Sequence, residues 1–375
     1  MNNISDDKSW KYSDFIENSN YNFDKNKIFN VLSKNEMNDA FNMISRWDGY
    51  SPTPLENLNH LASELQLKNI FYKDESKRFN LKSFKALGGA YAVEKVSQNK
   101  KNITVSTATA GNHGRSVAWG AKRLGLKCKI FISEFVSESR AEAMRGFGAE
   151  VFRVKGNYDN SLQECIKQSK LNGWQIVQDV AWEGYEIVPK LTMAGYSVMM
   201  KEISDQLKEN KITHIFLQAG VGGMAAAMIA GCARYLNNIP NIIIVEPESA
   251  DCVLKAVQNN TIVKINIEKE SLMGGMSCGE VSLIPWKIIN TNSKYCITVP
   301  DDKIADTIKS LANCSFSNKK LVGGECATPG IISLIASCNN SKLKDILNLN
   351  KDSQVLLLGC EGDVDEDLYN KLLNT

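Results

Sequence analysis

A lysine beside a pair of glycines is the residue best placed for covalent chemistry in this sequence. Residues 83–90 read Ser-Phe-Lys-Ala-Leu-Gly-Gly-Ala, which puts Lys85 at the predicted start of a helix. A partly desolvated lysine amine can form a Schiff base with a carbonyl compound. Phe84 and the apolar residues after Lys85 are expected to exclude water and to lower the pKa of the amine, as such chemistry requires near neutral pH.

A glycine-rich loop is the second candidate. It follows the apolar run at 215–217 and consists of Gly220, Val221, Gly222, Gly223 and Met224. Its backbone N–H groups, together with the N-terminus of the Ala-rich helix expected after it, predict a phosphate cradle. A dinucleotide would also fit such a loop, and Glu246 stands where a ribose-binding carboxylate would. Because the third glycine of the dinucleotide motif is absent and no hydride-transfer site is visible, a smaller phosphorylated cofactor is favoured.

A polar turn is the third candidate. Residues 110–114 read Ala-Gly-Asn-His-Gly. The side-chain amide of Asn112 can either cap the helix expected from Arg115 or bind a ligand. The residues alone leave both interpretations open.

The elements that would position these motifs alternate between short β-branched runs and longer amphipathic stretches. This pattern predicts an α/β fold with open, twisted, mostly parallel sheets flanked by helices. Helices are expected at 115–123 and 139–147. The first ~45 residues are polar and Asn-rich and are expected to form a surface extension. Strands are expected at 104–106, 129–132, 150–154, 175–177, 214–217, 241–245 and 354–358.

Composition agrees with a globular enzyme and argues against other classes. The 375 residues are 43% hydrophobic, which is enough for two lobes with sizeable cores. A net charge of +2 gives no field that would attract nucleic acid. No apolar run approaches the ~20 residues of a membrane span, and no signal peptide is visible, so we expect a cytoplasmic protein without membrane or nucleic-acid partners.

The ten cysteines show no metal-binding pattern. None forms a Cys-x-x-Cys pair, and none lies at zinc-ligand spacing beside the three histidines. We therefore expect no metal site. Most of the cysteines are expected to be small buried apolar side chains.

The order of these motifs resembles that of fold-type-II pyridoxal-phosphate enzymes of the threonine dehydratase and tryptophan synthase β superfamily. Three further strings resemble those of diaminopropionate ammonia-lyases: Lys-Asp-Glu-Ser-Lys-Arg-Phe at 73–79, Gln-Asp-Val-Ala-Trp-Glu-Gly-Tyr at 178–185 and Cys-Glu-Gly-Asp at 360–363. The resemblance runs from about residue 45 to the C-terminus. It implies pyridoxal 5′-phosphate as cofactor, a small amino acid as substrate and a homodimer. It also implies a small domain at 92–198, inserted in a large cofactor-binding domain formed by 1–91 and 199–375.

The resemblance assigns roles to single residues. In the family, the Schiff-base lysine follows an aromatic residue and precedes Gly-Gly, which selects Lys85 over Lys82. Asn112 matches the residue that contacts the phenolic oxygen of the cofactor, and His113 lies beside it under the ring. Cys360 stands where related enzymes place a hydroxyl or thiol near the pyridine nitrogen, and a neutral partner there favours β-elimination.

The implied reaction is α,β-elimination of 2,3-diaminopropionate to pyruvate and ammonia, with Lys85 taking the Cα proton. Asp179 and Asp363 are the carboxylates expected near the leaving amine, and Tyr185 is the aromatic expected at the pocket wall. The alternative is a dehydratase for serine, threonine or 3-hydroxyaspartate. A β-replacement synthase is disfavoured because its turn typically reads Ser-Gly-Asn-Thr-Gly. A non-catalytic amino-acid binder is disfavoured because Lys85 is present.

One departure from the family pattern concerns stereochemistry. Ala110 stands where the best-known members carry an aspartate on the cofactor face opposite the lysine. Because a methyl group cannot accept a proton, two interpretations follow. Either the enzyme is restricted to L-substrates with Lys85 as the base, or its pocket accepts another β-substituted amino acid.

Two cysteines are assigned by the resemblance alone. Cys252 and Cys278 match family cysteines that can form a disulfide near the pocket mouth. They are therefore a candidate disulfide pair, and the segment between them is expected to be a mobile flap. A reducing cytosol would oppose a persistent bond.

Overall fold

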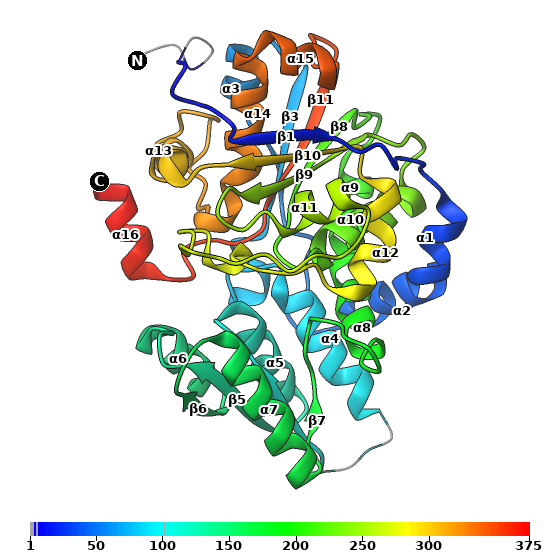
Figure 1. Ribbon diagram of the computed structural model, residues 1–375, viewed down its shortest axis with the longest axis vertical. Coiled ribbons are helices and arrows are strands. Elements are labelled where there is room, and N and C mark those ends of the chain that lie inside the picture. Colours follow the sequence, from blue (N-terminus) through cyan, green and yellow to red (C-terminus); the bar gives the residue numbers. More distant parts are fainter. Residues whose placement is uncertain (1–3, 5–6, 99, 101) are drawn as a thin grey trace.

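The computed structural model describes residues 4, 7–98, 100 and 102–375. It contains two β-sheets, one of seven strands and one of four, each flanked by helices. Figure 1 shows the larger sheet in the upper part of the molecule and the smaller sheet below it. We call these parts the large and the small lobe. The predicted α/β class with two mostly parallel sheets is confirmed.

The large sheet is mixed, with parallel strands inside and antiparallel strands at both edges. Because its inner strands are covered on both faces, they are buried along almost their whole length. Only the two edge strands run antiparallel to their neighbours. In spatial order the strands are β1 (Asp14–Glu17), β10 (Tyr295–Val299), β9 (Asn241–Pro247), β8 (His214–Gln218), β11 (Gln354–Gly359), β3 (Asn69–Asp74) and β2 (Leu55–Asn57).

The small sheet is parallel throughout. Its strands are, in spatial order, β6 (Glu150–Val154), β5 (Lys127–Ser133), β4 (Thr104–Ala108) and β7 (Gln175–Ile176). A second apolar core lies between this sheet and the helices beside it, with Val105, Ile130 and Val117 fully buried. All the predicted strands are present in one sheet or the other, within two or three residues of the predicted bounds.

The helices occupy the connections between strands, as crossovers between parallel strands require. Those around the small sheet and the lobe boundary are α4 (Lys85–Ser97), α5 (Asn112–Arg123), α6 (Glu138–Arg145), α7 (Tyr158–Asn172), α8 (Ile187–Tyr196) and α9 (Val198–Gln206). Those around the large sheet are α1 (Lys25–Val31), α2 (Lys34–Ile44), α3 (Asn59–Glu64), α10 (Gly223–Tyr235), α11 (Cys252–Asn259), α12 (Leu283–Asn292), α13 (Ile304–Ala312), α14 (Pro329–Asn339), α15 (Ser341–Leu347) and α16 (Glu366–Asn374).

The N-terminal segment is part of the large lobe, so its prediction as a surface extension is wrong. β1 pairs with β10, and the amphipathic helix α2 begins with a capping box between Ser33 and Glu36. The apolar side chains of this segment are spaced widely among polar ones, which hides them in composition. They are nevertheless buried in the main core, and they include Trp10, Ile28, Leu32, Met37 and Ile44.

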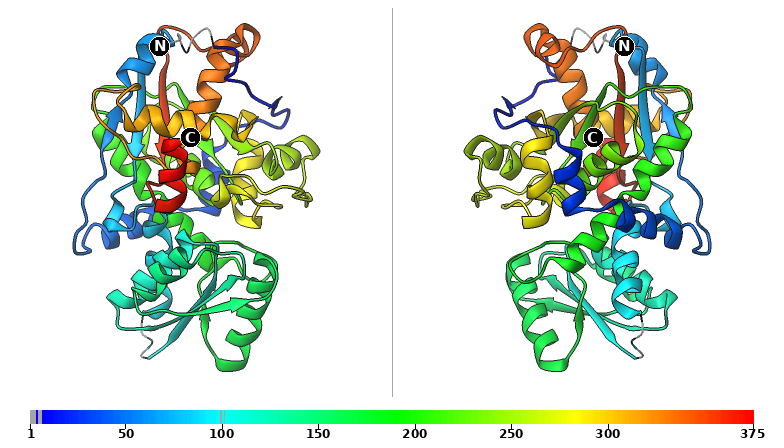
Figure 2. Two further views of the ribbon diagram at one scale, coloured as in Figure 1. Left: turned by 90° about the vertical axis from the view of Figure 1, so that its left-hand side faces the viewer. Right: turned by 90° about the vertical axis from the view of Figure 1, so that its right-hand side faces the viewer.

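The two lobes meet along helices rather than along a sheet. α4 packs against both α5 and α8, and α8 packs against α10. Two views from the sides show the lobes joined by this helical layer, with the C-terminal α16 in red on the large lobe (Figure 2). In the described part of the chain, no helix has the length and apolar content needed to cross a bilayer.

Candidate active site

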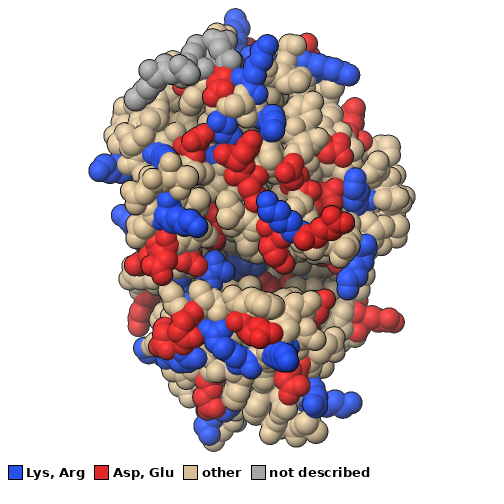
Figure 3. All heavy atoms as spheres, turned by 60° about the vertical axis from the view of Figure 1, so that its left-hand side comes forward, with Lys and Arg blue, Asp and Glu red and all other residues tan. Residues whose placement is uncertain are grey.

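The candidate residues gather where parallel strands end. In a doubly wound sheet, ligands bind outside the carboxyl ends of the strands. The glycine loop follows β8, Cys360 follows β11, and Asn112 follows β4 of the small sheet. Seen as spheres, the two lobes are separated by a hollow with basic and acidic side chains on its walls (Figure 3).

Lys85 lies at the start of α4, as predicted, but its charge environment differs from the prediction. Its Nζ contacts Asp179 Oδ2 at 2.5 Å, and 23% of the lysine side chain is exposed. Burial alone would lower the pKa of Lys85, yet the Asp179 carboxylate raises it well above its usual range. The prediction of a lowered pKa is therefore wrong for this state of the protein, because the sequence did not reveal the carboxylate beside the amine.

Asp179 is ionised in this arrangement. Burial opposes its charge, but the Lys85 ammonium, which donates a hydrogen bond to Oδ2, holds the pKa of the carboxyl well below its usual range. His113 Nε2 donates to the Val177 carbonyl at 2.8 Å, and its Nδ1 lies 3.6 Å from Asp179 Oδ2. Because burial lowers the pKa of His113, the imidazole is neutral, and Lys85 carries the cation of the group.

Two aromatic rings enclose the Lys85 ammonium. Nζ lies 5.5 Å from the Phe84 ring centroid and 5.7 Å from that of Tyr196. The Tyr196 hydroxyl is buried and has no hydrogen-bond partner among the described residues. Tyr196 was not identified from the sequence, since nothing in the string around it distinguishes it from an ordinary core tyrosine. An unpartnered hydroxyl beside a lysine is instead what a ligand-binding pocket would leave.

Asn112 occupies the first position of α5, and its side chain points across to the large lobe. Its Nδ2 donates to Glu361 Oε2 at 2.6 Å, while its Oδ1 is buried and without a partner in the described structure. The amide does not cap its own helix; the N-cap is Gly111, which has no side-chain cap hydrogen bond. The cap interpretation of Asn112 is thus excluded, and the ligand interpretation remains.

The glycine loop has the geometry of an anion cradle. Gly222 adopts φ +91°, and a Cβ there would lie 2.7 Å from Ile289 Cδ1. Gly220 is equally confined, since a Cβ would lie 3.0 Å from Cys278 Sγ. The loop leads directly into α10, whose buried N-terminal turn presents free backbone N–H groups. These residues fit a phosphate group, because only glycine lets the backbone approach this closely.

Cys360 is buried at the end of β11. Its thiol donates to the Cys326 carbonyl at 3.2 Å. Burial and the nearby Glu361 carboxylate raise the pKa of the Cys360 thiol well above its usual value, so the sulfur is neutral. The Cys360 carbonyl also accepts the Phe84 N–H at 3.0 Å, which ties the end of β11 to the segment carrying Lys85.

Lys82 and Asp363 lie outside the group formed around Lys85. Lys82 Nζ contacts Asp363 Oδ2 at 2.9 Å and Glu366 Oε1 at 2.7 Å. The Lys82 ammonium is therefore already paired with two carboxylates. Asp363, expected near the leaving amine, instead pairs with the lysine that the family pattern rejects.

The polar contacts of Tyr185 and Ala110 are with residues other than Lys85. The Tyr185 hydroxyl donates to the Ile176 carbonyl at 3.0 Å, and the ring stacks on Trp182 with centroids 4.2 Å apart. Tyr185 therefore supports the loop that carries Asp179 rather than forming part of the wall around Lys85. Ala110 is exposed, and its carbonyl accepts a hydrogen bond from Arg140 Nη1 at 3.2 Å.

Cys252 and Cys278 are both free thiols, so the candidate disulfide is not formed. They lie against the same glycine. Cys252 Sγ donates to the Gly220 carbonyl at 3.6 Å, and Cys278 Sγ packs beside the Gly220 Cα. All ten cysteines of the chain are free.

A cluster of three buried polar side chains, which the sequence did not reveal, lies between Asn112 and Cys360. One carboxylate oxygen each of Glu325 and Glu361 and the sulfur of Cys326 all lie within 4.8 Å of one another. Burial and the Glu361 charge raise the pKa of Glu325 to about 8. Arg140 of the small lobe reaches this group, with Nη2 3.5 Å from Glu325 Oε1.

A buried ionic network holds the segment that leads to Lys85. Arg78 donates to both carboxylate oxygens of Glu75 and of Glu202 at 2.7–2.8 Å. Lys73 Nζ contacts Glu202 Oε2 at 2.7 Å, and each of these side chains is at most 1% exposed. The network fixes a chain that then passes through left-handed backbone at Phe79 and Lys82.

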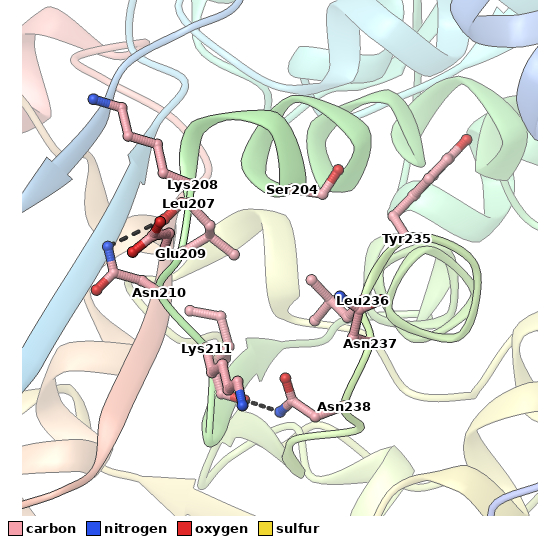
Figure 4. Close-up of a pocket in the computed structure, with 11 residues that line it drawn as sticks. Ser204, Leu207, Lys208, Glu209, Asn210, Lys211, Tyr235, Leu236, Asn237 and Asn238 are labelled. Atoms are coloured by element: carbon pink, nitrogen blue, oxygen red, sulfur yellow. Dashed lines mark hydrogen bonds between the residues drawn. The ribbon is translucent and has the colours of Figure 1, made fainter.

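A separate surface pocket lies at the opposite end of the strands of the large sheet, between the end of α9 and the loop after α10. Its lining residues include Ser204, Lys208, Lys211 and Tyr235 (Figure 4). Asn210 and Asn238 already donate to the Leu207 and Ile212 carbonyls. Because it lies near the start of β8, it is remote from the glycine loop at the end of that strand.

The chain matches known proteins over almost its whole length. Residues 46–333 match the family described as pyridoxal-phosphate dependent enzyme. The chain is 33% identical to diaminopropionate ammonia-lyase of Escherichia coli K12, over 93% of this chain and 95% of that protein. It is 34% identical to the Salmonella typhimurium protein of the same name, over 92% and 93%.

A solved structure shows the same similarity to the diaminopropionate ammonia-lyases. The crystal structure of the Escherichia coli ammonia-lyase, in complex with an aminoacrylate–PLP azomethine intermediate, superposes with a TM-score of 0.89 at 33% identity. The match covers 97% of this chain and 98% of that one. This protein therefore belongs to the pyridoxal-phosphate-dependent enzymes, is similar within them to the diaminopropionate ammonia-lyases, and takes pyridoxal phosphate as its cofactor.

Proposed function

We propose that this enzyme is an ammonia-lyase that converts 2,3-diaminopropionate, with the L isomer preferred, to pyruvate and two molecules of ammonia. The observation that carries the proposal is the contact between Lys85 Nζ and Asp179 Oδ2 in a site whose other walls fit a phosphorylated cofactor. The choice of substrate is supported by the similarity to the diaminopropionate ammonia-lyases.

The chain's own residues divide the work of binding. The loop from Gly220 to Met224, with the N-terminus of α10, would hold the cofactor phosphate. Asn112 would donate to the phenolic oxygen, and the neutral Cys360 thiol would face the pyridine nitrogen. When bound, pyridoxal phosphate supplies a ring that withdraws electrons from the substrate Cα.

Proton movement falls to the Lys85–Asp179 pair. As the neutral amine, Lys85 Nζ would take the proton from the substrate Cα, and Asp179 Oδ2 would stabilise the ammonium that results, as it does in this structure. The departing β-amine must itself be protonated. The proton held between Lys85 and Asp179 can be transferred to it. Phe84 and Tyr196 exclude water from the lysine while this happens.

A substrate screen tests the proposal. Purified enzyme with pyridoxal phosphate is mixed with L- and D-diaminopropionate, serine, threonine and 3-hydroxyaspartate, and keto-acid release is followed by absorbance. We expect the highest kcat/KM for L-diaminopropionate. A higher value for serine, threonine or 3-hydroxyaspartate would replace the ammonia-lyase with the alternative dehydratase, whose leaving group is a hydroxyl.

We propose further that the enzyme is a cytoplasmic homodimer. Ile187 is 75% exposed beside a groove that Val31, Ile284 and four polar or charged residues also line, and a second subunit would cover this exposed isoleucine. Light scattering should give twice the 41.6 kDa chain mass. We also propose the domain limits 1–91 with 199–375 and 92–198. The first limit is supported by α4, whose side chains up to Tyr91 belong to the main core while Ala92 belongs to the small one. At the second limit the main core reaches into α8, since Met193 and Tyr196 belong to it.

A further inference from the structure

Glu361 is a buried carboxylate with a fixed set of partners. Its Oε2 accepts Asn112 Nδ2 at 2.6 Å, and its Oε1 accepts the Cys326 N–H at 3.0 Å. The residue is 4% exposed. One oxygen therefore reaches into the small lobe while the other remains bonded to the large lobe.

The backbone around Glu361 fixes its position as firmly as its side chain. Glu361 forms an antiparallel bridge with Ser83, two residues before Lys85. Its carbonyl accepts the Gly324 N–H at 3.0 Å, and a Cβ at Gly324 would lie 3.1 Å from Glu361 Cγ. Glu361 is thus packed between the Lys85 segment and the 324–326 turn, so its carboxylate has little freedom to move.

An asparagine amide can present either its oxygen or its nitrogen to a neighbour. A carboxylate can only accept hydrogen bonds. Glu361 consequently forces the Asn112 nitrogen toward itself, because the opposite orientation would place two oxygens in contact. With that choice made, one N–H of Asn112 is used and the second N–H remains free for a ligand.

We propose that Glu361 is a positioning residue that sets the orientation of the Asn112 amide, so that Asn112 offers a donor, and not an acceptor, to the cofactor's phenolic oxygen. The inference rests on the proposed cofactor contact of Asn112, but it does not depend on which amino acid is the substrate.

The test compares Glu361→Gln with Glu325→Gln. Both variants replace a buried carboxyl group of the same cluster by an amide, but only the first changes the acceptor of Asn112 Nδ2. Pyridoxal phosphate affinity is measured by fluorescence titration. The ratio of the long- to the short-wavelength absorption band of the bound cofactor is measured in the same samples, since it reports the ionisation of the phenolic oxygen.

We expect Glu361→Gln to weaken cofactor affinity about 10-fold, the effect of losing one charge-assisted hydrogen bond, and to lower the band ratio. Glu325→Gln should change both by less than about twofold. Equal effects of the two variants would assign the result to a general disturbance of the cluster and overturn the proposal. A change in unfolding temperature with affinity and spectrum unchanged would assign Glu361 a purely structural role and also overturn it.

A second pair of variants covers the case in which Glu361→Gln does not fold. Asn112→Asp places a carboxylate against Glu361, whereas Asn112→Ala only removes the amide. We expect the aspartate variant to bind the cofactor more weakly than the alanine variant, and equal affinities would overturn the proposal. All these readouts use the cofactor alone, so an enzyme that binds it normally but releases no keto acid from diaminopropionate would refute the proposed function and leave this inference standing.

Discussion

At the scale of single residues, the identity of the anchoring lysine is open to direct test. We predict that Lys85→Ala abolishes turnover and the visible absorption of the bound cofactor, because no other amine lies beside Asp179 in the described part of the chain. Circular dichroism should show that folding is intact. Lys82→Ala is the control and should keep the absorption, since Lys82 pairs with Asp363 and Glu366. Loss in the Lys82 variant with retention in the Lys85 variant would transfer the role to Lys82.

A second prediction concerns stereochemistry at Ala110. The family pattern places a base opposite the lysine at the position of Ala110. Because alanine cannot accept a proton, we expect turnover of D-diaminopropionate at less than ~1% of the L rate, as loss of a positioned base typically costs 10²–10⁴-fold. Rates are measured by keto-acid release from each isomer. Ala110→Asp should raise the D rate and leave the L rate within a few fold. Comparable rates for both isomers in the unmodified enzyme would contradict the prediction.

The sequence predicted which residue types approach one another at the site, but not how they pair. Lys85 and Asp179 lie 94 positions apart, and only the fold shows that they are in contact. This contact reverses the expected direction of the Lys85 pKa shift. Asp363 and Tyr185 were identified from a motif, yet each is bonded to a neighbour outside the Lys85 group. Motif position alone does not determine where a side chain points.

At the scale of elements, we predict that the glycine loop has no room for a side chain at Gly222. Gly222→Ala adds a Cβ at φ +91°, 2.7 Å from Ile289 Cδ1. We expect a loss of about 1–3 kcal/mol in the free energy of unfolding and weaker binding of pyridoxal phosphate. Urea unfolding and fluorescence titration measure the two effects. Gly274→Ala is the matched control, since a Cβ there meets no atom within 4 Å. Equal behaviour of the two variants would exclude a confined loop.

Helix α11 begins against a buried acid that should make stability depend on pH. Glu246 accepts the Val253 and Leu254 N–H groups, yet burial outweighs these bonds and raises its pKa to about 8. The folded state therefore holds this proton more tightly than the unfolded state, whose pKa is the ordinary 4.5. The stability contribution of Glu246 is complete below pH 4.5 and is lost as the pH rises toward 8.

The expected result is a difference in slope. Between pH 5 and 8, the free energy of unfolding of the unmodified enzyme should fall relative to that of Glu246→Gln, by at most about 1.4 kcal/mol per pH unit. Chemical unfolding at several pH values gives both curves. Glu248→Gln, at an exposed neighbouring carboxylate, should follow the unmodified enzyme. Parallel curves for Glu246→Gln and the unmodified enzyme would show that Glu246 keeps the same pKa when the chain unfolds.

The strands predicted most clearly from the sequence are those with continuous apolar runs. β5, β8, β9 and β11 are of this kind, and their bounds agree closely with prediction. Four strands were missed. β3 and β10 are buried inner strands that were not predicted although their residues are largely apolar. β1 and β2 are only three or four residues long and lie at the sheet edges, where about half of the side chains are polar. α1 and α2 were missed for a related reason. Their buried residues are few and separated by Asn and Lys.

At the scale of the whole molecule, the N-terminal segment should be required for folding. We predict that a chain shortened to start at residue 46 does not fold, because it lacks β1 and at least five large buried side chains. Burial of each of these side chains stabilises the folded state by about 1.5–3 kcal/mol, and the net stability of a domain is only about 5–15 kcal/mol. Solubility and a thermal unfolding curve test this. Deletion of residues 1–9, which spares Trp10, is the control and should fold. A cooperative unfolding transition in the shorter chain would contradict the prediction.

The pairing of Asn112 with Glu361 has a consequence in time. The two residues are 249 positions apart. A ribosome adds about 5–20 residues per second, so roughly 12–50 s pass between the synthesis of one and of the other. In the later part of that interval, once residue 198 has been added, the small lobe and Lys85 exist without β11 and without the wall that faces the cofactor. The pocket is completed only as the last strand leaves the ribosome, so capture of pyridoxal phosphate is one of the final events in the production of this enzyme.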